Sequence, residues 1–378
     1  MLPRPLFTEE YELFREQARR FVQKEIVPYH DQWEKDGVVS RDVWLAAGEA
    51  GLLCCTLPEE YGGPGGDFLH ATIVLEELAK AGASGPAFHL HSDIVAPYIE
   101  AYGSEDQKKE WLPKMASGET IVAVAMSEPS GGSDLQNIQT RAIRDGNHFV
   151  INGQKVFISN GQIADLIVLA AKTDPGEKAK GVSLMLVERE REGFRRGRNL
   201  EKVGYKAQDT SELFFEDCRV PITNLLGEEG RGFAQLMTQL PQERLVVALR
   251  SATNIEAALD WTLQYTRERK AFGRPIAEFQ NTRFKLAEMK TKALVTRAFI
   301  DQCLALHLTG ELDTETASAA KLHATGTLCE VVDECVQLHG GYGYMWEYPI
   351  ARAWADARMT RIAGGTDEIM KEIIARGL

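Results

Sequence analysis

Apolar residues recur at helical spacing over three long stretches in the later part of the chain, and these stretches constrain the fold more than any other feature. They cover residues 233–267, 278–309 and 313–338, and a shorter helix is expected over residues 366–376. Each long helix has one apolar face, which it must bury against a neighbour. The pattern therefore predicts a helical bundle over residues 233–378.

Helical patterns also fill the first part of the sequence. A helix is expected to begin at Thr8 and to end near Pro28, and further helices are expected over residues 41–50, 68–81, 94–102 and 104–115. Ser104 and Gln107 have the spacing of a capping box. Residues 1–120 are therefore expected to form an all-helical domain.

Short apolar segments typical of strands occupy the middle of the chain. Strands are expected over residues 120–125, 166–171, 182–187 and 212–215. Asn152-Gly153 separates two further apolar runs and favours a type I′ turn, so a hairpin turning at these two residues is expected. Residues 121–232 are therefore expected to form a β-barrel or sandwich, which makes the chain an α+β protein of three domains.

Composition and charge exclude some functions. The formal net charge of −12 argues against nucleic-acid binding, which normally needs a basic surface. The six cysteines have no metal-ligand spacing, so no metal is expected, and a reducing compartment is favoured. No apolar run reaches transmembrane length, and residues 1–16 lack the pattern of a signal or transit peptide. No membrane span is therefore expected, and the cytoplasm is the expected location.

Glu243 is unusual within the first long helical stretch. It lies among apolar residues at helical spacing, with Arg244 beside it and Pro241 two residues before it. The proline removes one helix hydrogen bond and is expected to kink the helix there. A carboxylate on an apolar face costs free energy unless it is paired or used. The residues alone leave two interpretations open, a structural glutamate paired with arginine and a functional one.

Four local motifs have residue types suited to binding. Residues 125–134 follow a strand with hydroxyl side chains and a glycine pair, which allow close approach to a ring or phosphate. Residues 267–274 hold four basic side chains in eight, a composition that suits a phosphate. Each also has a structural interpretation, an ordinary turn for the first and a cationic helix end for the second.

The other two motifs are rich in glycine. Residues 337–344 contain His339 and three glycines, and Glu347, Arg352 and Asp356 follow them. Residues 363–369 place two glycines and Thr366 at the start of the last helix, which suits an anion. The structural interpretations are a helix stop and an N-cap.

Together the four motifs resemble the acyl-CoA dehydrogenase family over essentially the whole chain. Residues 125–137 match the family's first signature, and residues 337–356 match its second. Residues 240–245, 336–341 and 344–350 are most similar to the long-chain acyl-CoA dehydrogenases. The resemblance implies an N-terminal helical domain, a middle β domain and a C-terminal four-helix bundle.

The resemblance also implies non-covalently bound FAD and a homotetramer in which a second subunit completes each flavin site. The residues that match flavin-contacting positions of the family are Val124, Met126, Ser127, Ser133, Phe157, Ile158, Ser159, Arg269, Ala271, Phe272, Phe279, Gln280, Gln337, Leu338, Gly340, Gly341, Thr366 and Glu368. The residues that match substrate-contacting positions are Ser133, Arg244, Gly364 and Gly365.

The implied reaction is the α,β-dehydrogenation of a saturated acyl-CoA thioester to a trans-2-enoyl-CoA. A base removes the α-proton, and the β-hydrogen leaves as hydride to the flavin N5. The flavin ribityl 2′-hydroxyl and the backbone N–H of Gly364 would polarise the thioester carbonyl. Electron-transfer flavoprotein is the implied electron acceptor.

The sequence departs from the commonest family pattern at residue 364. Many members carry the catalytic glutamate at this position, where the chain has Gly364, whereas the long-chain and isovaleryl branches place it on the bundle helix, at the position of Glu243. Glu243 is therefore the expected base, and it is expected to lie near Gly364. The alternatives are an isovaleryl-type dehydrogenase of short branched chains and a non-catalytic assembly protein that keeps the fold.

Overall fold

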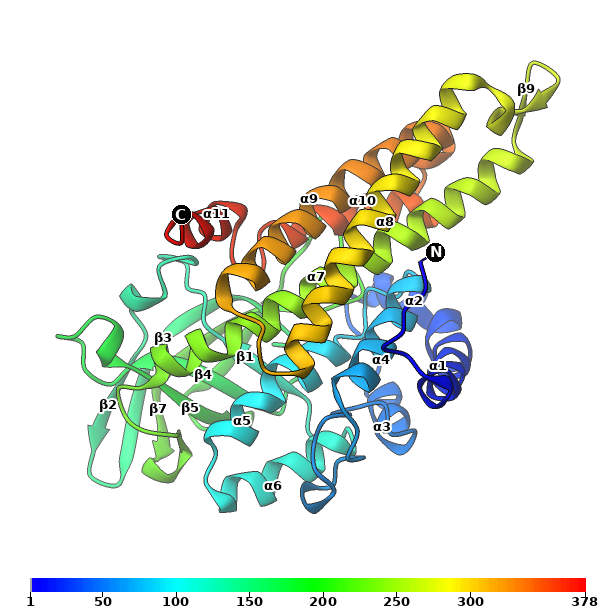
Figure 1. Cartoon of the computed structure of the whole chain (residues 1–378). Helices are drawn as coiled ribbons and strands as arrows, with labels where there is room; N and C mark the ends of the chain where they lie inside the picture. The colour runs from blue at the N-terminus through cyan, green and yellow to red at the C-terminus, as the bar shows by residue number, and fades with distance from the viewer. Residues whose placement is uncertain (1) are drawn as a thin grey trace.

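The computed structural model describes residues 2–378, which form a helical part, a β-sheet part and a second helical part in that order (Figure 1). The first part confirms the last four of its five predicted helices to within a few residues. Its elements are α1 (Glu9–Phe21), the π-helix η1 (Val22–Ile26), α2 (Val27–Asp36), α3 (Arg41–Glu49), α4 (Phe68–Lys80), the π-helix η3 (Leu90–Val95), α5 (Ala96–Tyr102) and α6 (Glu105–Ala116). Ser104 and Gln107 form the predicted capping box at the start of α6.

Two prolines explain where π-helical turns interrupt the α-helices of this part. Pro28 and Pro97 each lie at the start of an α-helix that directly follows a π-helix. Because proline has no N–H, the carbonyl four residues earlier loses its α-helical partner and the hydrogen-bond register can shift. The prediction that the first helix ends near Pro28 is therefore wrong, since the chain continues as α2 to Asp36.

Eight strands between the helical parts form one sheet. They are β1 (Val122–Ala125), β2 (Arg141–Asp145), β3 (His148–Ser159), β4 (Leu166–Lys172), β5 (Val182–Glu188), β6 (Phe194–Asn199), β7 (Thr210–Pro221) and β8 (Leu225–Leu226). The strand order is β6-β7-β3-β2-β4-β5-β8, with β1 parallel to β4. The sequence predictions missed β2, β6 and β8.

The prediction of a hairpin turn at Asn152-Gly153 is wrong, because the turn lies earlier in the chain. Asp145 pairs with His148, so the turn between β2 and β3 is at Gly146 and Asn147, and Gly146 has a φ of 59°. Gly153 instead lies inside β3, where the pairing register with β7 shifts. A Cβ on Gly153 would lie 2.6 Å from the Cα of Thr140, so the glycine is needed for close strand approach at this bulge.

Both faces of β4 are buried, which joins the sheet to the helices. Leu166, Val168 and Ala170 pack into a core shared with the helical parts. The alternate residues Ile167 and Leu169 pack into a second core formed within the sheet. Because side chains alternate across a strand, β4 connects the two cores.

The second helical part is a bundle, as predicted. Its elements are α7 (Gly232–Glu268), β9 (Lys270–Ala271), β10 (Arg274–Pro275), α8 (Gln280–Leu308), α9 (Thr314–His339), α10 (Pro349–Thr360) and α11 (Asp367–Ala375). A third core combines apolar residues of α7, α8, α9 and α10, including Leu259, Met289, Val332 and Ile350. The α7 helix continues through Pro241 without interruption. Over residues 2–378, no helix combines the length and apolar character that crossing a membrane requires.

Candidate active site

Glu243 lies in the interior, where α7 meets α5. Its side chain is buried, with the residue only 8% exposed, and Oε1 accepts a hydrogen bond of 2.6 Å from the Tyr98 hydroxyl. Burial raises the pKa of the Glu243 carboxyl to about 7, although the Tyr98 hydrogen bond and the Arg244 guanidinium both act to lower it. The carboxyl can therefore gain or lose a proton near neutral pH.

Gly364 lies against the same face of α7. A Cβ built on Gly364 would lie 3.5 Å from Cγ2 of Val247, which is one helical turn beyond Glu243. Gly364 and Gly365 both have positive φ angles, 67° and 96°, which favour glycine. The structure thus places Gly364 against α7 one helical turn from Glu243, although the two residues are far apart in the sequence.

Lys321 fixes the loop that carries these glycines. It is fully buried on α9, and its Nζ donates a 2.6 Å hydrogen bond to the carbonyl of Gly365. Burial lowers the pKa of Lys321 to about 8, while Asp367 opposes the shift. Thr366 caps α11 through its hydroxyl, which accepts from the backbone N–H of Ile369 at 3.4 Å.

The Arg244 side chain contacts α9 of the bundle. Its Nη1 donates to the hydroxyl of Ser318 at 3.2 Å, and its Nε is buried without a hydrogen-bond partner among residues 2–378. Such a group can donate to a ligand atom. The geometry is consistent with the expected substrate-binding role of Arg244, but it makes Tyr98 the closer partner of Glu243.

The first signature loop is tied to β3. The backbone N–H of Val156 donates to the carbonyl of Ser127 at 3.0 Å, and Lys155 Nζ donates to the carbonyl of Met126 at 2.8 Å. Lys155 also contacts the buried Glu128 carboxylate at 2.9 Å. Two segments that match flavin-contacting positions, residues 124–133 and 157–159, are therefore held side by side.

Phe157 projects from a β-bulge beside this loop. Its φ is 62°, and the pairing of β3 with β7 shifts register between Lys155 and Ile158. The bulge leaves the Phe157 side chain 69% exposed while Ile158 remains buried. Bulges and left-handed non-glycine residues cluster at functional sites. An exposed ring beside the partly exposed Val124 and Ser127 fits a flat ligand such as an isoalloxazine ring.

A second group of predicted flavin residues lies at the opposite end of the bundle. Figure 1 shows the β9–β10 hairpin at the tip of the α7–α8 pair, away from the sheet. This tip carries Arg269, Ala271, Phe272, Phe279 and Gln280. Phe272 is 96% exposed and has a φ of 53°.

The end of α9 adjoins the same tip, so Gln337, Leu338, Gly340 and Gly341 belong to this second group. The Tyr265 hydroxyl donates to the carbonyl of His339 at 3.1 Å, and the Arg269 guanidinium lies 5.5 Å from the centre of the Tyr342 ring. His339 is buried and stacks on Tyr265, which supports a structural role for it. Within one chain, this second group of residues does not reach the first signature loop and Phe157.

Two of the predicted binding residues have exposed side chains. Ser133 lies in the exposed part of the first signature loop, and Glu368 lies on the exposed side of the first turn of α11. The pKa of Glu368 is lowered chiefly by backbone hydrogen bonding at the helix start. Both side chains are therefore free to meet a ligand from the solvent side.

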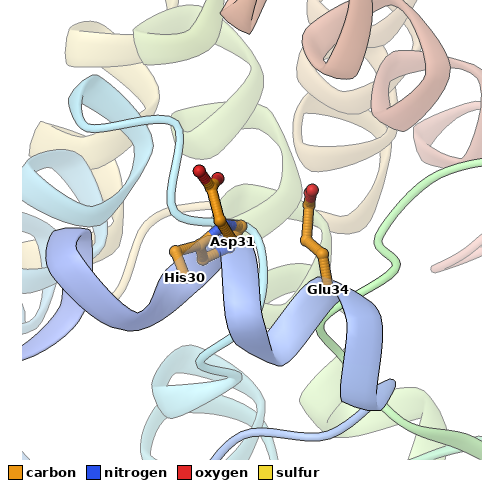
Figure 2. A group of neighbouring side chains, drawn as sticks. All are labelled: His30, Asp31 and Glu34. Carbon is orange, nitrogen blue, oxygen red and sulfur yellow. The ribbon is translucent and has the colours of Figure 1, made fainter. Parts of the chain in front are cut away.

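One side-chain group in residues 2–378 has the spacing of a metal site, namely His30, Asp31 and Glu34 on α2 (Figure 2). Arg352 already pairs with both carboxylates, with Nη1 2.5 Å from Asp31 and 3.7 Å from Glu34. His30 Nε2 accepts from the backbone N–H of Gly85 at 3.1 Å. These contacts account for the cluster, and the second signature's Arg352 therefore joins α10 to α2.

Sequence interpretation missed Tyr98 and Lys321. A signal existed for Lys321, since a lysine on the apolar face of a bundle helix is as unusual as Glu243 is on α7. No sequence signal connects Tyr98 with Glu243, because only the packing of α5 on α7 brings them together.

Comparisons with known proteins identify one family along nearly the whole chain. Family models for the N-terminal, middle and C-terminal domains of acyl-CoA dehydrogenase match residues 8–119, 123–218 and 230–378. The long-chain specific acyl-CoA dehydrogenase, mitochondrial, of Sus scrofa is 52% identical over 375 residues, which cover 99% of this chain and 87% of that protein. The mitochondrial isovaleryl-CoA dehydrogenase of Oryza sativa is 37% identical, with 99% and 92% covered.

A solved structure shares the fold. The crystal structure of acyl-CoA dehydrogenase from Geobacillus kaustophilus has a TM-score of 0.96 and 50% sequence identity, and the match covers 98% of each chain. The identity and coverage together support shared architecture in all three parts.

Proposed function

The chain belongs to the acyl-CoA dehydrogenase family, and we propose that it oxidises long-chain saturated acyl-CoA thioesters with Glu243 as the α-proton base. The observation that carries the base assignment is the buried Glu243 carboxyl, hydrogen-bonded to Tyr98 and adjacent to the Gly364 loop. The 52% identity to a long-chain specific enzyme, against 37% to an isovaleryl enzyme, supports a long-chain substrate.

The surroundings of Glu243 suit proton abstraction from a carbon acid. A carboxyl with a pKa near 7 is a stronger base than an exposed glutamate and is still substantially ionised at neutral pH. The single hydrogen bond from Tyr98 holds Oε1 in place. Burial keeps water away from the α-carbon that the base must reach.

The Gly364–Gly365 loop is the proposed cradle for the thioester carbonyl. Negative charge develops on that oxygen as the α-proton leaves, and a fixed backbone N–H stabilises it. Gly364 would supply this donor. Lys321 holds the neighbouring carbonyl of Gly365 at 2.6 Å, which keeps the loop in position before substrate binds.

FAD is the proposed cofactor, and when bound it would accept the β-hydrogen as hydride. Within one chain, the first signature loop and the Phe157 bulge would hold the ring system, and Thr366 with Glu368 would lie near the phosphate and ribityl region. Figure 1 shows the α7–α8 tip away from the sheet, so a second subunit would have to bring its Arg269 and Gln337 to this site. The proposed assembly is the homotetramer that the family resemblance implies. Electron-transfer flavoprotein is the proposed electron acceptor.

The cytoplasm remains the proposed location, and fractionation of the native host tests it. Recovery of the protein in a membrane-enclosed compartment would contradict the proposal. The Sus scrofa and Oryza sativa relatives are both named as mitochondrial.

Reduction of bound flavin by a series of acyl-CoAs tests the proposed substrate. Anaerobic mixing with straight acyl-CoAs of increasing length should bleach the flavin absorbance fastest with long chains. A maximum rate with isovaleryl-CoA would support the short branched-chain alternative instead. A purified protein without flavin, or a flavin that no acyl-CoA reduces, would support the non-catalytic alternative.

A further inference from the structure

Asp93 is a buried carboxyl that the proposed chemistry does not use. It lies within the π-helix η3 and is 6% exposed, and its Oδ1 has no hydrogen-bond partner among residues 2–378. It lines a small cavity of about 10 Å³ between η3, α4 and the segment that follows α3. The other lining residues are mainly apolar, including Leu52, Val74 and Phe88.

The position of Asp93 is linked directly to the turn that carries the base. Pro97 lacks the N–H that would otherwise bond to the Asp93 carbonyl in an α-helix. That carbonyl accepts instead from Nε2 of Gln242 at 2.7 Å, and Gln242 precedes Glu243 on α7. The widened helical turn therefore packs beside Glu243 and directs the Asp93 side chain toward the cavity.

Among the residues that line this cavity, Asp93 has a buried side-chain oxygen with no hydrogen-bond partner in residues 2–378. The Ser92 hydroxyl already accepts from the backbone N–H of Cys54 at 2.8 Å, and His89 Nε2 lies 3.2 Å from Nη1 of Arg250. Burial raises the pKa of Asp93 to about 8, so the group is an uncharged carboxylic acid at neutral pH. It can then donate one hydrogen bond and accept others.

An acyl chain whose α-carbon lies at Glu243 must continue between the elements that enclose this residue. These are η3 and α5 on one side and α4 on the other, and both sides pack on α7. The Asp93 cavity lies between η3 and α4, so it lies in the direction that the chain can follow. Its volume is near the minimum for a single water molecule or a group of similar size.

We propose that Asp93 is a specificity-determining residue that contacts the distal part of the acyl chain and selects substrates carrying a hydroxyl group there. This inference rests on the proposed acyl-CoA dehydrogenase function. A buried polar group without a partner loses free energy, which a hydroxyl placed opposite it restores. Sites with such a group discriminate strongly against the analogue that lacks the hydroxyl. The apolar walls would disfavour a charged terminus.

The test compares straight saturated acyl-CoAs with isomers of the same length that carry one hydroxyl at successive distal carbons. The ratio of kcat/KM for hydroxylated over plain substrate should peak at one position and reach at least about tenfold there. A flat profile, with no hydroxyl position preferred over the plain chain, would overturn the inference. Flavin reduction by the plain chain decides the proposed function separately.

Two variants separate polarity from size. Asp93→Leu removes the hydrogen-bonding group, so the peak should disappear and the ratio should fall to about one or below. Val74→Ala enlarges the same cavity without changing Asp93, so the peak should remain. If Asp93→Leu does not fold, Asp93→Ala serves instead and should also lose the peak. A peak that survives Asp93→Leu, or one that moves when only Val74 changes, would contradict the assignment.

Discussion

At the scale of single residues, the Tyr98–Glu243 hydrogen bond sets the protonation of the proposed base. The tyrosine stabilises the ionised carboxylate and so partly opposes the increase in pKa that burial causes. Burial alone would place the carboxyl still further above its usual range. The balance between the two effects determines the pH at which the enzyme becomes active.

Tyr98→Phe should shift this balance. Without the hydroxyl, the pKa of Glu243 rises further above about 7, so the rising limb of the kcat/KM profile should move to higher pH by up to about one unit. The measurement is flavin reduction from pH 6 to pH 9. Tyr102→Phe, one turn further along α5, is the control and should leave the midpoint unchanged. A midpoint at lower pH in Tyr98→Phe would contradict the assigned hydrogen bond.

Glu243 should also make stability depend on pH. Its pKa is about 7 in the folded protein and 4.5 in an exposed glutamate, so the folded form binds more protons between these values. The free energy of unfolding therefore falls as the pH rises through this window. Glu243→Gln cannot titrate, so its stability relative to the wild type should increase by about 1–3 kcal/mol from pH 5 to pH 8.

Urea unfolding of the holoenzyme at both pH values measures this difference. The exposed Glu110→Gln variant is the control and should differ from the wild type by a similar small amount at both. A Glu243→Gln advantage that is larger at pH 5 than at pH 8 would reverse the expected sign.

The sequence identified Glu243 because a carboxylate on an apolar helix face is rare and because Gly364 leaves the alternative position without a base. Tyr98 could not be identified in the same way. Its partner lies 145 residues away, and a tyrosine among apolar residues is ordinary in a core. Asp93 lies just before the helix predicted over residues 94–102, and the direction of its side chain depends on the π-helical turn before Pro97, which the sequence did not predict.

At the scale of elements, Lys155 on β3 holds the first signature loop in place. It donates to the carbonyl of Met126 and contacts Glu128, which also accepts from the backbone N–H of Thr140 at 3.0 Å. The loop is therefore positioned by a buried ion pair instead of by sheet hydrogen bonds alone. Breaking such a pair leaves a buried charge without compensation.

Lys155→Met should destabilise the protein by about 3–5 kcal/mol and weaken flavin binding. Denaturant unfolding and the dissociation constant of FAD measure the two effects. Arg198→Met removes an exposed pair with Glu212 and should change stability by less than about 1 kcal/mol. Equal effects of the two variants would show that Lys155 does not organise the loop.

Sequence periodicity predicted the long elements and failed for the short polar ones. The three long bundle helices end within a few residues of their predicted limits because each has a continuous apolar face. Strand β2 was missed because four of its five residues are not buried, so it lacks an apolar run. The turn predicted at Asn152-Gly153 was wrong because the glycine lies at a bulge inside β3. There it allows the close approach of Thr140, which the sequence does not reveal.

At the scale of the whole molecule, the exposed tip of the bundle indicates an interface. Phe272 is almost fully exposed, and the exposed Tyr344 and Met345 follow the end of α9, which adjoins this tip. Apolar side chains gathered on a surface usually mark an interaction site. The proposed tetramer would cover them with the flavin and a second subunit.

Phe272→Asp should therefore reduce both the oligomeric state and the retention of flavin, while the circular dichroism of the chain stays the same. Aspartate tolerates the positive φ at this position, so the hairpin itself should persist. Light scattering and the ratio of flavin to protein absorbance measure the outcome. Val203→Ser, which changes an exposed apolar residue of the β part, should leave both unchanged. A Phe272→Asp tetramer with full flavin content would contradict the proposed interface.

The central claim is that Glu243 is the base, and the reductive half-reaction of the Glu243→Gln holoenzyme tests it most directly. Wild type and variant, both with bound FAD, are mixed anaerobically with the best long-chain acyl-CoA, and the flavin absorbance is followed. Rapid bleaching is expected in the wild type. In the variant, which should still bind flavin and substrate, the rate of bleaching should be lower by about 10²- to 10⁴-fold. Bleaching of Glu243→Gln at the wild-type rate would show that another group removes the α-proton.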